Sequence, residues 1–99
     1  MERIDHIAIA VLNVRQAANW YAKNLDCKIK YKDKTYALLE FDNVDLAIVS
    51  LAEHPPHIAI VDESLDENKS GIMKHRDGSV GIYEHDMHGN MIEKIKYKK

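Results

Sequence analysis

A short segment that occurs twice, half a chain apart, limits the folds open to this protein more than any other feature. The sequence HIAI stands at residues 6–9 and again at residues 57–60, 51 residues later in a chain of 99. A fainter echo pairs NVDLAI at residues 43–48 with NMIEKI at residues 90–95, displaced by 47 residues. Because both echoes keep the same order, they predict one domain built from two similar modules. We place module one at residues 1–53 and module two at residues 54–99, joined near Pro55-Pro56.

Module one is predicted to have the element order βαβββ. Residues 4–11 alternate as a strand, with Ile7 and Ile9 on one face and His6 on the other. Asn13, followed by Gln16, is typical of a helix N-cap, and the predicted helix runs to about residue 25. Its apolar stripe can cover the isoleucine face. Residues 28–31, 36–41 and 44–50 then predict three strands.

Module two repeats this order without a full helix. Residues 57–61, 72–75, 79–84 and 91–97 predict strands, whereas residues 62–70 are too short and polar for the expected helix. On the last predicted strand, Lys94 and Lys96 share the face opposite Glu93, where a covered sheet carries apolar residues. The lysines therefore agree with a truncated second helix.

Charge and cysteine content exclude several classes of protein. The net charge is -2, so we expect no nucleic-acid or membrane-surface partner, because both need a concentrated positive field. The basic stretches at residues 28–34 and 94–99 are interpreted as solvated strand faces. Cys27 is the only cysteine, and residues 1–6 lead directly into a strand pattern, which together favour a reducing cytoplasm.

Size adds an expectation about assembly. A chain of 99 residues buries only about 60–65% of the surface that its unfolded form exposes. An apolar sheet face left open in so small a domain is best covered by a second subunit. We therefore expect a homodimer.

Several segments, taken in order, resemble the vicinal-oxygen-chelate superfamily of glyoxalases, epimerases, extradiol dioxygenases and fosfomycin or bleomycin resistance proteins. The opening strand at residues 4–11, the helix with Trp20-Tyr21, residues 56–60 and the closing hairpin at residues 83–92 each have a counterpart there. The resemblance implies an α+β glyoxalase-like fold, in which two βαβββ modules form a half-open barrel around a metal ion.

The same resemblance implies the metal ligands. The family's two histidines correspond to His6 and His57, and its last-strand glutamate corresponds to Glu93. If residues 43–48 align with residues 90–95, the family's fourth ligand position corresponds to Leu46, which cannot bind a metal. A shift of one residue offers Asp45 instead, but points it at the opposite face of the sheet. The four-ligand arrangement of glyoxalase I or methylmalonyl-CoA epimerase is therefore not expected here.

The chemistry of these side chains supports a metal site over two ordinary core histidines. Two imidazoles and a carboxylate suit Zn, Ni, Mn or Fe as a divalent cofactor and leave positions open for water and substrate. The other histidines are interpreted as solvated: His54, His85 and His88 in loops, and His75 on a polar strand. Trp20 and Tyr21 are interpreted as packing residues.

Two functions stay open at this point. The first is a metal-dependent enzyme of the lyase, isomerase or dioxygenase type, acting on a small molecule with adjacent oxygens. Its proton shuttle would be Glu93, the candidate catalytic residue, or a metal-bound hydroxide. The second is a non-catalytic small-molecule-binding or resistance protein of the same fold.

Overall fold

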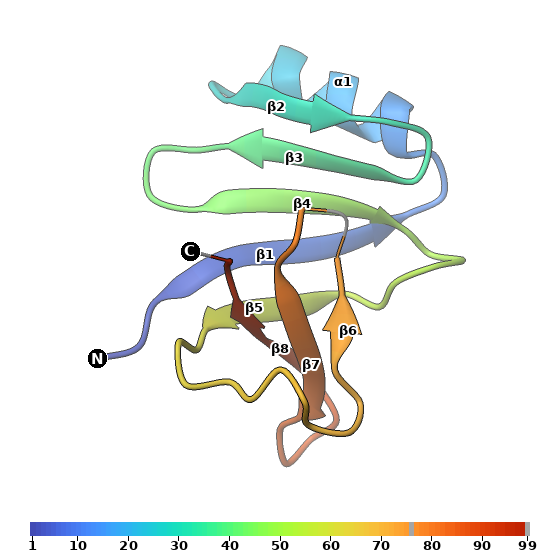
Figure 1. Ribbon diagram of the computed structural model, residues 1–99. Coiled ribbons are helices and arrows are strands. Elements are labelled where there is room, and N and C mark those ends of the chain that lie inside the picture. The colour runs from blue at the N-terminus through green and yellow to red at the C-terminus, as the bar shows by residue number, and fades with distance from the viewer. Residues whose placement is uncertain (76, 99) are drawn as a thin grey trace. The chain divides into compact units, whose positions relative to one another are not determined.

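The computed structural model describes residues 1–75 and 77–98. They form two compact units (Figure 1). The N-terminal unit comprises residues 6–56, and the C-terminal unit comprises residues 1–5 together with the described residues from 57 onward. The boundary in the connector lies close to the predicted one, but residues 1–5 join the second half of the chain. No helix in the described part of the chain is long and apolar enough to cross a membrane.

The N-terminal unit is a four-stranded sheet with one helix on one face (Figure 1). The strand order is β2-β3-β4-β1, with β1 and β4 parallel and the other neighbours antiparallel. The elements are β1 (Ile4–Val11), α1 (Val14–Asn24), β2 (Lys28–Lys32), β3 (Tyr36–Glu40) and β4 (Asp45–Ser50). This confirms the predicted order βαβββ, with strand ends shifted by one residue at most.

Helix α1 begins where the sequence predicts. Asn13 is the N-cap, and its side-chain oxygen accepts a hydrogen bond from the backbone N–H of Gln16 at 2.9 Å. Val14 and Ala18 are buried against three residues of the sheet, Ala37, Leu39 and Ile48. The helix ends at Leu25, which is the C-cap and is 46% exposed.

The C-terminal unit has a sheet of four strands in the order β5-β8-β7-β6, with β5 and β8 parallel. The strands are β5 (His57–Val61), β6 (Met73–Lys74), β7 (Val80–His85) and β8 (Met91–Lys96). Residues 62–72 form turns rather than a helix, so the truncation of the second helix is confirmed. Residues 1–5 attach to this unit through hydrogen bonds from the backbone N–H of Val61 to the Arg3 carbonyl and from the Tyr97 hydroxyl to Asp5.

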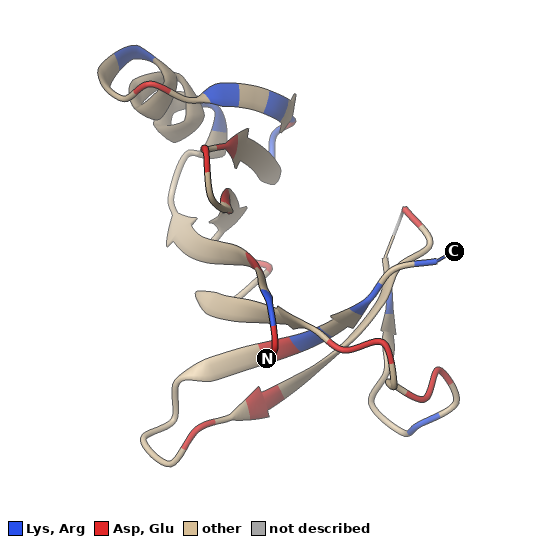
Figure 2. Cartoon of the chain, turned by 90° about the vertical axis from the view of Figure 1, so that its left-hand side faces the viewer, with Lys and Arg blue, Asp and Glu red and all other residues tan. Residues whose placement is uncertain are grey.

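The basic stretch of the N-terminal unit lies on the edge strand β2, where lysines alternate with other residues (Figure 2). Lys30 contacts Asp45 at 3.0 Å, and Lys32 donates to the Asn19 side chain at 2.8 Å. Charged side chains on an edge strand oppose pairing with other chains. The interpretation of this stretch as a solvated strand face is confirmed.

Candidate metal centre

Strand pairing in the C-terminal unit brings two of the predicted ligands to one face. Glu93 on β8 is directly opposite Ala59 on β5, and Ala59 shares its face with His57 because the two are two residues apart on one strand. Both side chains are buried, with His57 8% and Glu93 3% exposed. His57, Ala59 and Glu93 therefore lie on one face of this sheet.

His57 and Glu93 contact each other directly. The Nε2 atom of His57 lies 3.3 Å from Oε1 of Glu93. An ion bound to nitrogen and oxygen at about 2.0–2.2 Å with tetrahedral angles separates its ligand atoms by about 3.4 Å. The two side chains therefore fit neighbouring positions around one divalent ion, in both donor type and spacing.

A third side chain, His75, reaches the other oxygen of the same carboxylate. Its Nε2 lies 2.9 Å from Oε2 of Glu93, and the imidazole is 32% exposed. The interpretation of His75 as a solvated strand residue is therefore wrong. The strand β6 ends at Lys74, and a turn in which the His75 backbone N–H donates to the Ser79 carbonyl directs the ring toward β8. Strand pairing agrees with this placement, since Met73 is opposite Gly81 and Gly81 is opposite Ile95, two residues from Glu93. The sequence alone does not contain this register.

The missing side chain of Gly81 makes this contact possible. A Cβ atom at Gly81 would overlap Oε2 of Glu93 and lie 3.0 Å from Nε2 of His75. Gly81 has no positive φ, so its importance here is space rather than backbone conformation. Its position on β7 leaves room for a carboxylate and an imidazole side by side.

The buried carboxylate is held in its charged form. Burial raises the pKa of Glu93. Hydrogen bonds from His57 and His75 and attraction to both rings lower this pKa by a larger amount, to about 2. The hydrogen bond to Glu93 raises the pKa of His75 against the opposing effect of burial. At neutral pH Glu93 is therefore an anion, which is the form that binds a metal ion.

Tyr83 lies on the far side of the His57 ring. Its hydroxyl is 3.5 Å from Nδ1 of His57, and the two rings meet edge to face with centroids 5.2 Å apart. Burial and then repulsion from Glu93 raise the pKa of Tyr83 to about 12, so the hydroxyl stays protonated. When an ion takes the place of the Nε2 proton, the ring keeps its other proton on Nδ1, where the Tyr83 hydroxyl can accept it.

The remaining predicted ligand, His6, belongs to the N-terminal unit. It is half-buried near the start of β1, and its partner on β4 is Asp45. The expectation for the fourth position needs correction. Leu46 pairs with Ile7 and packs with the core under α1, so it lies on the helix side of the sheet. Asp45 shares the face of His6, contrary to expectation, and contacts Lys30.

Register also identifies the true counterpart of Glu93 in the first half. Glu93 is opposite Ala59, and the repeat equates Ala59 with Ala8, whose partner on β4 is Ala47. The echo between residues 43–48 and 90–95 is thus displaced by one residue from the structural correspondence. Alanine offers no ligand atom, so the conclusion that the family's four-ligand set is incomplete holds.

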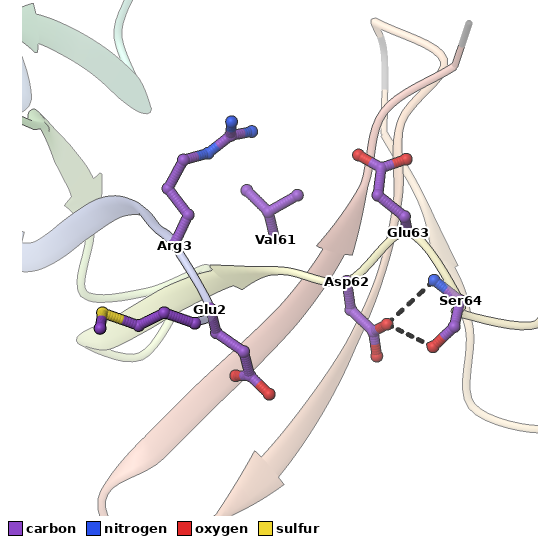
Figure 3. A pocket seen from close by; sticks show the side chains of 7 residues that line it. Glu2, Arg3, Val61, Asp62, Glu63 and Ser64 are labelled. Atoms are coloured by element: carbon purple, nitrogen blue, oxygen red, sulfur yellow. Dashed lines mark hydrogen bonds between the residues drawn. The ribbon is translucent and has the colours of Figure 1, made fainter.

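The other histidines and a surface hollow of the C-terminal unit lie away from this contact. His54, His85 and His88 are exposed, as predicted. A hollow of about 520 Å³ is lined by residues 1–3 and 61–64 (Figure 3). The Asp62 carboxylate at its wall accepts hydrogen bonds from the Ser64 backbone and hydroxyl. This hollow includes neither His57 nor Glu93.

Comparison with known proteins shows the fold. No protein-family model matches the chain, and no curated protein matches it by sequence. Methylmalonyl-CoA epimerase of Streptomyces coelicolor, solved with 2-nitronate-propionyl-CoA, is 19% identical with a TM-score of 0.78, and the match covers 98% of each chain. The epimerase of Mycobacterium tuberculosis is 18% identical with a TM-score of 0.74, over 97% of this chain and 88% of that one.

Other solved structures share the fold under different names. A hypothetical protein of Bacillus halodurans C-125 is 19% identical with a TM-score of 0.80, over 99% of this chain and 96% of that one. A Legionella pneumophila protein described as an NAD-dependent benzaldehyde dehydrogenase is 15% identical with a TM-score of 0.72, over 94% and 98%. The chain therefore has the α+β fold of methylmalonyl-CoA epimerase, and the fold alone does not fix an activity.

Proposed function

We propose that this protein is a metal-dependent enzyme that moves a proton on a small molecule with adjacent oxygens, an isomerase-type reaction. The ion would be held by His6, His57 and Glu93, which supply one ligand atom each. The observation that carries the proposal is the buried Glu93 carboxylate, which has its Oε1 atom 3.3 Å from Nε2 of His57.

The donor set decides the class of ion. Two imidazole nitrogens and one carboxylate oxygen suit a borderline divalent ion such as Zn, Ni, Mn or Fe. His6 and His57 occupy equivalent positions of the repeat, and each is followed two residues later by an alanine on the same face of its strand. Three protein ligands leave coordination positions for a substrate.

The chemistry would be divided between the ion and the chain. A bound divalent ion supplies the electrophile, polarising a carbonyl and stabilising the negative charge that develops when a neighbouring proton leaves. Glu93 holds its negative charge in a buried site, and Tyr83 keeps its proton and stays a hydrogen-bond donor near His57. Glu93 is also our candidate for the proton shuttle, in the state in which it leaves the ion.

The solved epimerases with this fold support the isomerase type over the lyase and dioxygenase types. One of them is held in complex with methylmalonyl-CoA, whose exchangeable proton lies between two carbonyl groups. Such a substrate presents two oxygens that one ion can bind together. Methylmalonyl-CoA is therefore the first compound to test, followed by smaller dicarbonyl compounds.

A second function, small-molecule binding without chemistry, is favoured by Ala47. It occupies the β4 position that corresponds to Glu93, so this chain has one metal ligand fewer than a symmetrical four-ligand site. In a binding protein the walls of the site, rather than an ion, would hold the ligand.

Two substitutions distinguish these functions. In the enzyme, His57→Ala and Glu93→Gln should each lower metal affinity and abolish metal-dependent proton exchange, measured as deuterium uptake by methylmalonyl-CoA or a smaller dicarbonyl compound. The exposed His88→Ala is the matched control and should change neither. If both site variants bind metal as the natural chain does, the site is wrongly placed. If they lose metal but bind the small molecule unchanged, the protein is a binding module.

A further inference from the structure

The Glu93 carboxylate has different partners on its two oxygens. His57 lies on the Oε1 side, and His75 lies on the Oε2 side. The 2.9 Å contact of His75 is a normal hydrogen-bond distance for a ring N–H and a carboxylate. This hydrogen bond uses one lone pair of Oε2 and fixes the orientation of the carboxylate, which favours Oε1 as the oxygen that binds an ion.

We propose that His75 is a positioning residue, which holds Oε2 of Glu93 by a hydrogen bond so that Oε1, beside His57, is the oxygen that binds the metal. This inference rests on the proposed function. It adds a residue outside the ligand set His6, His57 and Glu93, and it states which carboxylate oxygen binds.

The burial pattern supports the division of roles. The His57 and Glu93 side chains are 5% and 4% exposed, whereas the His75 ring is 32% exposed. A side chain that binds the ion directly lies in the buried part of the site. A side chain that only orients a metal ligand can lie at the solvent-exposed edge of the site. His75 directly follows the short edge strand β6 and reaches the carboxylate through the gap left by Gly81.

Removing the contact between His75 and Glu93 should weaken metal binding. Partners that hydrogen-bond to a metal ligand typically change metal affinity about 10–100-fold when they are lost. His75→Leu should therefore weaken binding of Co²⁺ or Zn²⁺ by about that factor. His75→Gln, whose amide can still donate to Oε2, should recover most of the affinity. His88→Leu is the matched control, because His88 is exposed in the turn before β8.

The test is titration of the whole chain with Co²⁺, which reports affinity and, through its visible absorption, the ligands of the ion. We expect weaker binding in His75→Leu, recovery in His75→Gln, and the natural absorption bands once either variant is saturated. Unchanged affinity in His75→Leu overturns the inference. Altered bands at saturation also overturn it, because His75 would then be a ligand itself. If His75→Leu does not fold, His75→Asn, whose amide is too short to reach Oε2, replaces it. A natural chain that binds no ion instead refutes the proposed function.

Discussion

Replacing Gly81 with alanine tests whether the missing side chain at this position of β7 makes room for the Glu93 carboxylate. The new methyl group would overlap Oε2 of Glu93 and approach Nε2 of His75 to 3.0 Å and Cδ of Glu93 to 3.2 Å. Glu93 is 3% exposed, so the carboxylate has little room to move aside. The substitution should therefore break the contact between Glu93 and His75.

Two opposing contributions decide whether Gly81→Ala raises or lowers the free energy of unfolding. A hydrogen bond to a charged group contributes about 1.5–3 kcal/mol to the free energy of unfolding. An alanine in a strand otherwise stabilises by about 0.5–1 kcal/mol relative to glycine. The net loss expected for Gly81→Ala is about 0.5–2.5 kcal/mol, which for a domain of this size lowers Tm by about 2–20 °C.

Urea unfolding in the presence of a chelator measures this without any metal contribution. The matched control is the same substitution in a Glu93→Ala background, where the overlapped atoms are gone and Gly81→Ala should be neutral or stabilising. A stabilised Gly81→Ala in the natural background would refute the reasoning, because the glycine would then have no steric purpose.

Three further predictions concern the rest of the chain. Asn13→Ala should lower the free energy of unfolding by about 1 kcal/mol in urea, whereas Asn13→Asp, which keeps the cap acceptor, should not. Hydrogen bonds from Ser79 lower the pKa of Asp77, so the folded chain binds fewer protons than the unfolded chain in acid. This contribution is present above about pH 4 and is lost as the pH falls, so Asp77→Asn should flatten the acid side of a stability profile. Light scattering should show a homodimer that covers exposed strand residues such as Ile4 and Ile58, which are 50% and 42% exposed, and a monomer at all concentrations contradicts this.

The sequence predicted the elements well because local signals and burial agreed. Alternation identified β1 and β5 with their observed ends, and the cap at Asn13 identified the start of α1. The polar segment at residues 62–70 correctly indicated that no second helix forms. These features depend on neighbours within a few residues, which a single sequence contains.

Strand register and turn geometry could not be predicted from this single sequence. The echo that made Leu46 the first-module counterpart of Glu93 was displaced by one residue, and in a strand such a shift exchanges the two faces. His75 was interpreted as solvated because of its charged neighbours, yet a tight turn between β6 and β7 directs it to Glu93. Likewise, Gly81 has no local pattern that indicates a carboxylate beside it.

The most direct test of the central claim is the metal content of the protein purified without chelator. Elemental analysis should find close to one divalent ion per chain among Zn, Ni, Mn and Fe, and much less in Glu93→Gln purified in parallel. A natural chain that holds no such ion, and takes up none on titration with Zn²⁺ or Co²⁺ at neutral pH, would contradict the account.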